Sequence, residues 1–336
     1  MLLPGLLRFW NMPGAPATRL TSWGSLMKQH IVFRLSAALV LLAGGAILAA
    51  QQVPGVATVP SSPAKQFGGS ISPAFEGWFD NPDGTHSFLI GYYSRNTQSE
   101  LDIPIGPNNK FEPGNADMGQ PTHFLTRRRF GMFVVTMPKE YGKTQKITWT
   151  LSVNGNTVTV PFYMHTDYNL TPLKSQEESP NREFNRPPIL KFVEGGATLV
   201  GPMGTGLRPA LQRTATVGTP MPLDAWADDD ALYSTGGNAP LTGERTLVTL
   251  NVTKYRGPGA VTVANPVKFA TLKGGKPMEA YSGKASTTVT FSEPGEYMLH
   301  VNGGDLSGNG GGGSGCCWTT AIIRVTVAGP GRTGGQ

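Results

Sequence analysis

Cysteine is scarce in this 336-residue chain: only two are present, and they are neighbours, Cys316 and Cys317. A disulfide framework that ties distant strands within one chain is therefore excluded. Charged residues are also few, at 15%, whereas glycine and proline are abundant, with 44 and 28 copies. Many short strands joined by Gly/Pro turns produce this bias, and a disordered chain would have more charge and fewer aromatic residues. Because no segment has the hydrophobic period of a helix, the sequence predicts an all-β fold.

Positive charge is concentrated at the amino terminus. The formal net charge is +6, but residues 1–50 contain no acidic residue and carry Arg8, Arg19, Lys28 and Arg34. The rest of the chain is close to neutral and has no electrostatic footprint for nucleic acid. We therefore expect partners other than nucleic acid.

One long hydrophobic run is present, Leu35–Ala50, and it follows the basic segment Met27–Arg34. Its 16 residues fall short of the roughly 20 that a membrane-spanning helix needs. The run ends in small residues before Gln51, as a secretory signal peptide does, and no cysteine there indicates a lipoprotein. An uncleaved signal anchor stays open, and Met27 is favoured over Met1 as the start. The sequence predicts a secreted, periplasmic or cell-surface protein.

Changes in composition divide the chain into parts. These are an upstream segment with the signal peptide (1–50), a flexible leader (51–69), a first β-sandwich domain (70–167), a polar linker (168–188), a second β-sandwich domain (189–328) and a flexible tail (329–336). In the first domain, Asn154-Gly155 predicts a hairpin over Lys146–Phe162, because both turn residues adopt positive φ at low cost. Other strands are predicted at Phe75–Phe79, Ser87–Ser94 and Phe130–Met137.

The most regular stretch of the second domain is Thr287–Asp305. Apolar residues alternate with polar ones on both sides of Pro294-Gly295. Proline fixes φ and glycine allows positive φ, so this pattern predicts a β-hairpin. Further strands are expected at Ile189–Phe192, Thr198–Val200, Arg213–Val217, Pro222–Ala227, Thr246–Tyr255, Val261–Val263 and Ala321–Val327.

Four pieces of the second domain carry a resemblance to a known type of module: Val217–Asp230, Asn251–Val263, Thr287–Val301 and Ile322–Val327. Together, over about residues 214–327, they resemble PKD-like and related immunoglobulin-like modules of secreted bacterial proteins. The resemblance implies a two-sheet sandwich and a role in binding, spacing or presenting other molecules. It also implies that alternate residues face the core: Leu223, Ala225, Ala227, Leu250, Val252, Tyr297, Leu299 and Val301.

Cys316 and Cys317 leave three states open: a vicinal disulfide, a bridge to another chain, and a buried reduced pair. A vicinal bridge would stand beside Trp318 at the end of the glycine-rich segment Gly303–Gly315. It would then present a stiff apolar patch. Cys316, Cys317 and Trp318 are therefore the predicted ligand-binding residues, for a sugar or a peptide.

Acidic residues gather at one corner of the second domain, where Asp228, Asp229 and Asp230 are consecutive. Calcium takes about six to eight oxygen ligands, and clustered carboxylates supply them. With Asp224 and Asp305 they are candidate calcium ligands. The alternative is a solvated corner, because aspartate is common in turns.

Other polar and aromatic groups have ordinary explanations beside functional ones. Arg127–Arg129 could hold an anionic glycan, but a charged strand edge that discourages sheet pairing is favoured. The pair His165 and Asp167 could act on a substrate or metal, although an ordinary strand-end pair is favoured. Four aromatic residues could stack on sugars unless the core takes them: Trp78, Phe79, Tyr92 and Tyr93.

The chain lacks the motifs of nucleophilic, zinc-dependent and nucleotide-binding sites, so no catalytic residue is predicted. We predict an exported, non-catalytic binding, adhesion or scaffold protein whose partner is an extracellular or periplasmic protein or a glycan. The alternative is a carbohydrate-binding accessory protein, and a hydrolytic enzyme is less favoured. No cofactor is expected other than calcium.

Overall fold

The computed structural model describes residues 63–175, 184–202, 209–232, 244–264, 267–268, 271–273, 280–305 and 316–330. Within these ranges the regular structure is β-strand, apart from one short 3₁₀ helix, η1 (Thr166–Tyr168). The prediction of an all-β fold is therefore confirmed. In the described part of the chain, no helix has the length and apolar character needed to cross a membrane. The predicted signal peptide lies outside the described residues.

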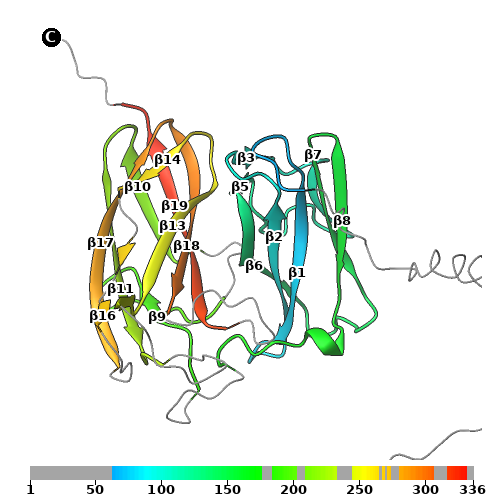
Figure 1. Ribbon diagram of the computed structural model, residues 1–336, viewed down its shortest axis with the longest axis horizontal. Coiled ribbons are helices and arrows are strands. Elements are labelled where there is room, and N and C mark those ends of the chain that lie inside the picture. The colour runs from blue at the N-terminus through cyan, green and yellow to red at the C-terminus, as the bar shows by residue number, and fades with distance from the viewer. Residues whose placement is uncertain are drawn as a thin grey trace, which may run out of the picture. The chain divides into compact units, whose positions relative to one another are not determined.

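We call residues 63–175 the first half of the described chain and the described residues from 184 to 330 the second half. The first half is built around two three-stranded sheets (Figure 1). One has the order β1-β2-β6, from β1 (Ile71–Asp80), β2 (His86–Ser94) and β6 (Arg127–Met137). The other has the order β4-β7-β8, from β4 (Asn109–Glu112), β7 (Ile147–Val153) and β8 (Asn156–Phe162). The hairpin prediction is confirmed, because β7 pairs with β8 and both turn residues, Asn154 and Gly155, have positive φ.

Aromatic residues fill the space between these two sheets. Trp149 is fully buried, and its indole N–H donates to Asn109 Oδ1 at 2.9 Å, which satisfies its only polar group. Its ring stacks on Phe111 and meets Phe133 edge-on, with centroids 5.6 and 5.3 Å apart. The alternation predicted for β7 thus places its apolar side chains in a core shared by both sheets.

The second half is a two-sheet sandwich with an immunoglobulin-like strand order. One sheet has the order β14-β17-β11-β9, from β9 (Ile189–Lys191), β11 (Met221–Asp229), β14 (Val261–Val263) and β17 (Tyr281–Phe291). The other has the order β10-β19-β18-β13-β15, from β10 (Leu211–Thr216), β13 (Thr249–Arg256), β15 (Val267–Lys268), β18 (Gly295–Gly304) and β19 (Trp318–Ala328). β10 pairs in parallel with β19, whereas all other strand pairs in both sheets are antiparallel. The residues predicted to alternate inward are all buried.

The predicted hairpin over Thr287–Asp305 is wrong. β17 and β18 belong to different sheets, so the chain crosses from one sheet to the other at Pro294-Gly295. Tyr297 fixes this corner: its hydroxyl donates to the Glu293 carbonyl at 2.9 Å and accepts from the Gly259 N–H at 2.9 Å. Apolar residues on both sides of the corner face one core from opposite sheets. Local alternation is the same in a hairpin and in such a corner.

Two further strand predictions differ from the structure. The segment expected as one strand from Thr246 is divided, because β12 (Glu244–Thr246) pairs with β16 (Thr271–Lys273) and β13 joins the larger sheet. Leu199 makes an isolated bridge with Leu190 in place of a strand. In both places the hydrophobic pattern is correct, and tertiary pairing decides where regular structure breaks.

The sheet that contains β18 and β19 is buried on both of its faces. Tyr297, Leu299 and Val301 face the core of the second half, while His300 and Ile322 on the other face are also buried. Ile322 belongs to the hydrophobic cluster of the first half. A smaller cluster joins Trp318 to residues of the first half: Phe79, Leu89, Val134 and Leu170.

Residues 57–336 consequently form one compact unit. The predicted linker packs where it is described, because Leu170 N donates to the Trp78 carbonyl at 2.8 Å and Asn185 is fully buried. The division into two domains at 167 and 189 stays a prediction.

Candidate functional site

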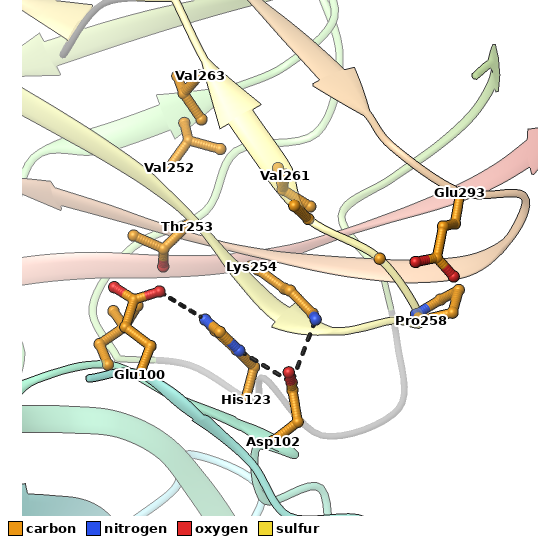
Figure 2. Close-up of a pocket in the computed structure, with 13 residues that line it drawn as sticks. Glu100, Asp102, His123, Val252, Thr253, Lys254, Pro258, Val261, Val263 and Glu293 are labelled. Carbon is orange, nitrogen blue, oxygen red and sulfur yellow. Dashed lines mark hydrogen bonds and ion pairs between the residues drawn. The ribbon is translucent and has the colours of Figure 1, made fainter. Parts of the chain in front are cut away.

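A cleft of about 500 Å³ lies between residues of the two halves (Figure 2). Glu100, Asp102 and His123 line it from the first half, around the short ladder of β3 (Leu101–Asp102) and β5 (His123–Phe124). Leu125 also lines it from the first half. The second half contributes Lys254 on β13, Glu293 at the corner, and a set of mostly apolar residues: Val252, Thr253, Pro258, Gly259, Ala260, Val261 and Val263.

The strand pairing explains why these side chains meet. Asp102 is the direct partner of His123 in the β3–β5 ladder, and Glu100 stands two residues before Asp102. Residues two apart in an extended segment point to the same side, so the two carboxylates reach the histidine together. Asn109 fixes the backbone next to both strands of this ladder, because its side-chain amide donates to the carbonyls of Ile103 and Pro121 at 2.9 Å each.

His123 bridges the two carboxylates. Its Nε2 is 3.0 Å from Glu100 Oε2, and its Nδ1 is 2.9 Å from Asp102 Oδ1 (Figure 2). A neutral imidazole has only one N–H, whereas an ionised carboxylate only accepts. Both contacts are hydrogen bonds to carboxylates only when His123 is the doubly protonated imidazolium. The hydrogen bond from His123 is the main cause that lowers the pKa of Glu100, against the opposing effect of desolvation.

Lys254 completes the cluster from the other half. Its Nζ is 3.1 Å from Asp102 Oδ1, so Asp102 accepts from both His123 and Lys254. Only 7% of the Lys254 side chain and 10% of the His123 side chain are exposed, against 50% for Glu100 and 57% for Asp102. Lys254 and His123 are therefore covered, and the carboxylates are what the cleft presents to solvent.

Contacts next to the cleft hold its two walls together. Arg256 makes a bidentate pair with Asp117, at 2.9 and 2.8 Å, and also donates to the Gln120 carbonyl. The Tyr255 hydroxyl donates to the Gly119 carbonyl at 2.5 Å. Bidentate arginine pairs impose geometry as well as attraction. The walls of the cleft are thus held in a defined relation by side chains of β13.

Sequence reasoning missed this cleft. The histidines are scattered along the chain, and more than a hundred residues separate His123 from Lys254. The one local signal is the acid–x–acid spacing of Glu100 and Asp102, which is too common to point to a site. Lys254 falls within a strand whose pattern indicated only core packing.

Replacing His123 by leucine is expected to raise the pKa of Glu100 toward its ordinary value, because the main cause of its lowering is removed. A carboxyl with a lowered pKa stabilises the fold above its unfolded pKa and loses that contribution as pH falls through the folded pKa. The variant should therefore lose less stability in acid from Glu100, by about 1 kcal/mol or less for so exposed a group. NMR titration of the Glu100 carboxyl carbon measures the shift, with His86→Leu as control because His86 pairs with Asp80 instead. An unchanged Glu100 titration in His123→Leu would contradict the assignment.

The predicted ligand-binding segment is not an exposed patch. Cys316 and Cys317 form the vicinal disulfide that was one of the predicted states. Both are buried, and Trp318 is only 1% exposed because its ring packs against the first half. The expectation of a surface platform is therefore wrong. A ligand-binding role of these three residues stays a prediction.

The five predicted calcium ligands separate into different environments. Asp224 pairs with Lys284 and Ser286, and Asp228 pairs with Lys191 and Ser282. The other three accept hydrogen bonds from backbone N–H groups or from the Asn185 amide: Asp229, Asp230 and Asp305. Among the described residues, no three His, Cys, Asp or Glu side chains form a group that could hold a metal ion. Calcium binding stays a prediction.

Asp229 has the most unusual environment of the acidic corner. Burial, followed by the neighbouring charge of Asp305, raises the pKa of Asp229 to about 8. Its Oδ1 accepts from the Ala231 N–H at 2.8 Å. Its Oδ2 is buried and has no hydrogen-bond partner in the described part of the chain.

The arginine run and the aromatic residues find structural roles. Arg128 lies on the edge strand β6, but its side chain is partly buried: it makes a bidentate pair with Glu76, at 2.7 Å to each oxygen, and lies over the Phe130 ring. Of the aromatic residues considered for sugar stacking, the core takes Trp78, Phe79 and Tyr92. His165 caps η1 by accepting from the Asp167 N–H.

Comparison with solved structures finds remote likenesses. No protein-family model matches the chain, and no curated protein does. Among solved structures, domains 4 and 5 of the S-layer protein SbsC are 11% identical, covering 58% of this chain and 70% of that one, with a TM-score of 0.19. The D00–D0 domain of intimin is 9% identical, covering 77% and 100%, with a TM-score of 0.21.

The adhesive subunit CfaE of the CFA/I fimbria of enterotoxigenic Escherichia coli is also similar. It is 9% identical, covering 80% of this chain and 81% of its own, with a TM-score of 0.13. At TM-scores this low, none of these likenesses carries an argument about what this chain does. An argument about function therefore rests on the strand order and on the geometry of the cleft.

Proposed function

We propose that this chain is an exported, non-catalytic adhesion or scaffold protein that holds a basic side chain of a partner protein in the cleft between its two halves. The observation that carries the proposal is the arrangement of charge in the cleft. Two covered side chains, Lys254 and His123, hold the half-exposed carboxylates of Glu100 and Asp102 in place. The cleft therefore offers fixed acceptors to a cation.

The remaining walls suit the stem of a lysine or arginine. Val252, Val261 and Val263 give one wall an apolar surface, and Glu293 places a third carboxylate at the opposite end of the cleft (Figure 2). Among the described residues, no ion pair engages the Glu293 carboxylate. Long basic side chains bury their methylene groups on apolar surface while their charged ends reach polar groups. The apolar wall of the cleft suits the methylene stem, and its carboxylates suit the charged end.

Several features support binding over catalysis for the cluster. His123 uses both ring nitrogens on carboxylates, so neither is available to take a proton from a substrate. Lys254 is committed to Asp102. The side chains are held by pairing with one another, as in a recognition surface on a rigid frame.

Export is supported by two independent features. The basic segment Met27–Arg34 followed by the apolar run Leu35–Ala50 has the order of a secretory signal. The disulfide between Cys316 and Cys317 fits an oxidising compartment. We therefore place the protein in the periplasm, at the cell surface or outside the cell.

A peptide array tests the proposed function. We expect the full chain to bind peptides that contain lysine or arginine and to lose them when these residues are replaced by methionine or glutamine. The double variant Glu100→Gln/Glu293→Gln is expected to weaken binding by roughly tenfold or more, because hydrogen bonds to charged groups are lost. Binding should also weaken as salt increases.

Glu112→Gln is the matched control for this experiment. Glu112 is exposed and pairs with Lys110, and it does not line the cleft. It should bind the array as the unchanged protein does. Equal binding of basic and neutral peptides, or full binding by the double variant, would refute the proposed function.

A further inference from the structure

A second pocket, of about 630 Å³ and so larger than the cleft, lies at the end of the sheet formed by β9, β11 and β17. This volume lies in the range of pockets that hold small molecules. Its wall is mostly apolar, and Leu173 on its rim is one of the exposed large hydrophobic residues. The remaining apolar wall is formed by Pro187, Ile189, Val200, Ala280 and Tyr281.

Three consecutive carboxylates line this mostly apolar pocket, and in two of them both oxygens already have partners. Asp228 pairs with Lys191 at 2.9 Å and accepts from the Ser282 hydroxyl at 2.6 Å. Asp230 accepts from the backbone N–H groups of Arg186 and Leu232, at 3.1 and 2.9 Å. Their oxygens are used in holding the fold together.

Asp229 differs from both neighbours. It continues the inward alternation of β11 and is only 6% exposed, yet it belongs to the lining of the pocket. One of its oxygens accepts from Ala231, and the other has no partner in the described part of the chain. A buried carboxyl oxygen without a donor is costly, so its retention calls for an explanation.

The charged residues around the pocket indicate which charge a ligand of Asp229 would carry. Asp228, Asp229 and Asp230 meet there, and Asp305 is close enough to Asp229 to raise its pKa. Lys191 is already used by Asp228, and Arg186 is exposed. The raised pKa means that Asp229 keeps its proton near neutral pH, and an ammonium group at the same oxygen takes the place of that proton and balances the carboxylate charge. A cationic donor is therefore favoured over an anion or a second carboxyl group.

We propose that this pocket binds a small hydrophobic amine, with the apolar body against Leu173, Ile189 and Val200 and the ammonium group donating to Asp229. This site is separate from the cleft and does not depend on the function proposed for it. The apolar wall and the unpartnered oxygen of Asp229 define a molecule with an apolar body and one charged end, because both oxygens of Asp228 and of Asp230 already accept from groups of the protein.

Calorimetric titration with three matched probes tests the proposal: tryptamine, tryptophol, in which a hydroxyl replaces the amine, and indole-propionate, which is an anion. We expect tryptamine to bind at least roughly tenfold more tightly than either of the others, since only it supplies a charged donor. Asp229→Asn should abolish this preference. Equal binding of tryptamine and tryptophol, or no binding of tryptamine, would overturn the proposal.

Two further variants keep the test independent of folding. Asp224→Asn is the matched control, because Asp224 lies on the same strand but outside the pocket, and it should keep the preference for tryptamine. Val200→Trp is expected to fill the pocket and remove tryptamine binding while thermal melting still shows a folded protein. If calcium alone binds and Asp229→Asn removes calcium binding, the corner is an ion site and the amine proposal is wrong.

Discussion

Trp318→Ala is expected to lower the free energy of unfolding by about 3–5 kcal/mol, the usual cost of truncating a large buried aromatic residue. Trp318 begins β19 in the second half, but its ring packs in a cluster with Phe79, Leu89 and Leu170 of the first half. The truncation removes packing that joins the halves. Denaturant unfolding measures this loss of free energy. It is followed by far-ultraviolet circular dichroism, which reports on the backbone and not on the substituted tryptophan.

Two controls separate this packing from a general surface effect. Trp318→Phe keeps the apolar contacts and removes an indole N–H that has no partner in the described residues, so it should cost much less. Phe67→Ala truncates an exposed aromatic residue and should change stability by about 0.5 kcal/mol or less. If Trp318→Ala were as mild as Phe67→Ala, the contact between the halves would not contribute to stability.

A second arm tests the same contact from the first half. A Cβ atom on Gly131 would overlap the Trp318 ring, and Gly131 also has a positive φ of 47°. Gly131→Ala is therefore destabilising in the unchanged protein. In the Trp318→Ala background the overlap with the ring is gone, whereas the backbone strain and a closer contact with Leu89 are left, so the two changes together should cost less than their sum.

Lowering the pH from above 6.5 to about 4 is expected to remove about 3 kcal/mol of stability through His300 alone. His300 is completely buried between the halves, stacked on Tyr255, and burial lowers its pKa from 6.5 to about 4. Below 6.5 the unfolded chain binds a proton that the native protein does not. Unfolding is therefore favoured progressively as pH falls toward 4, at about 1.4 kcal/mol for each pKa unit of difference.

His300→Phe isolates this contribution. The variant keeps a ring against Tyr255 but leaves the Met132 backbone without its hydrogen bond from His300. That loss is the same at every pH, so it changes the level of the stability curve and not its slope. The unchanged protein loses stability through His300 as pH falls from 6.5 to 4, and the variant does not. Any excess in the free energy of unfolding of the unchanged protein over that of His300→Phe should therefore shrink or reverse over this range.

Chemical denaturation at a series of pH values measures that difference, and all other titrating groups cancel in it. An equal acid slope in the unchanged protein and in His300→Phe would show that His300 is not held neutral at the interface.

Much of the strand content could be predicted from the sequence, because it depends on neighbours along the chain. Asn154-Gly155 predicts its hairpin through backbone preferences that act within two residues. The alternation of Leu223, Ala225 and Ala227 predicts the inward face of β11 because the period of a strand is two. These signals are local, and no other part of the chain can change them.

The candidate sites could not be predicted in this way. Glu100 and Asp102 meet Lys254 only because two sheets distant in sequence pack together, and no spacing along the chain encodes that meeting. The acidic corner was recognised as a cluster, but its members look alike in the sequence. Only the fold separates the paired Asp228 from the unsatisfied Asp229.

The sequence by itself determined that the chain is all-β, where most strands lie and which residues of the second half face its core. It also determined that its two cysteines could only pair with each other or outside the chain. The tertiary structure decided that Thr287–Asp305 is a corner between sheets and not a hairpin, and that His300 and Trp318 are buried. The reason is physical: strand patterns record that a side chain is covered, whereas the partner that covers it is chosen by packing across the whole molecule.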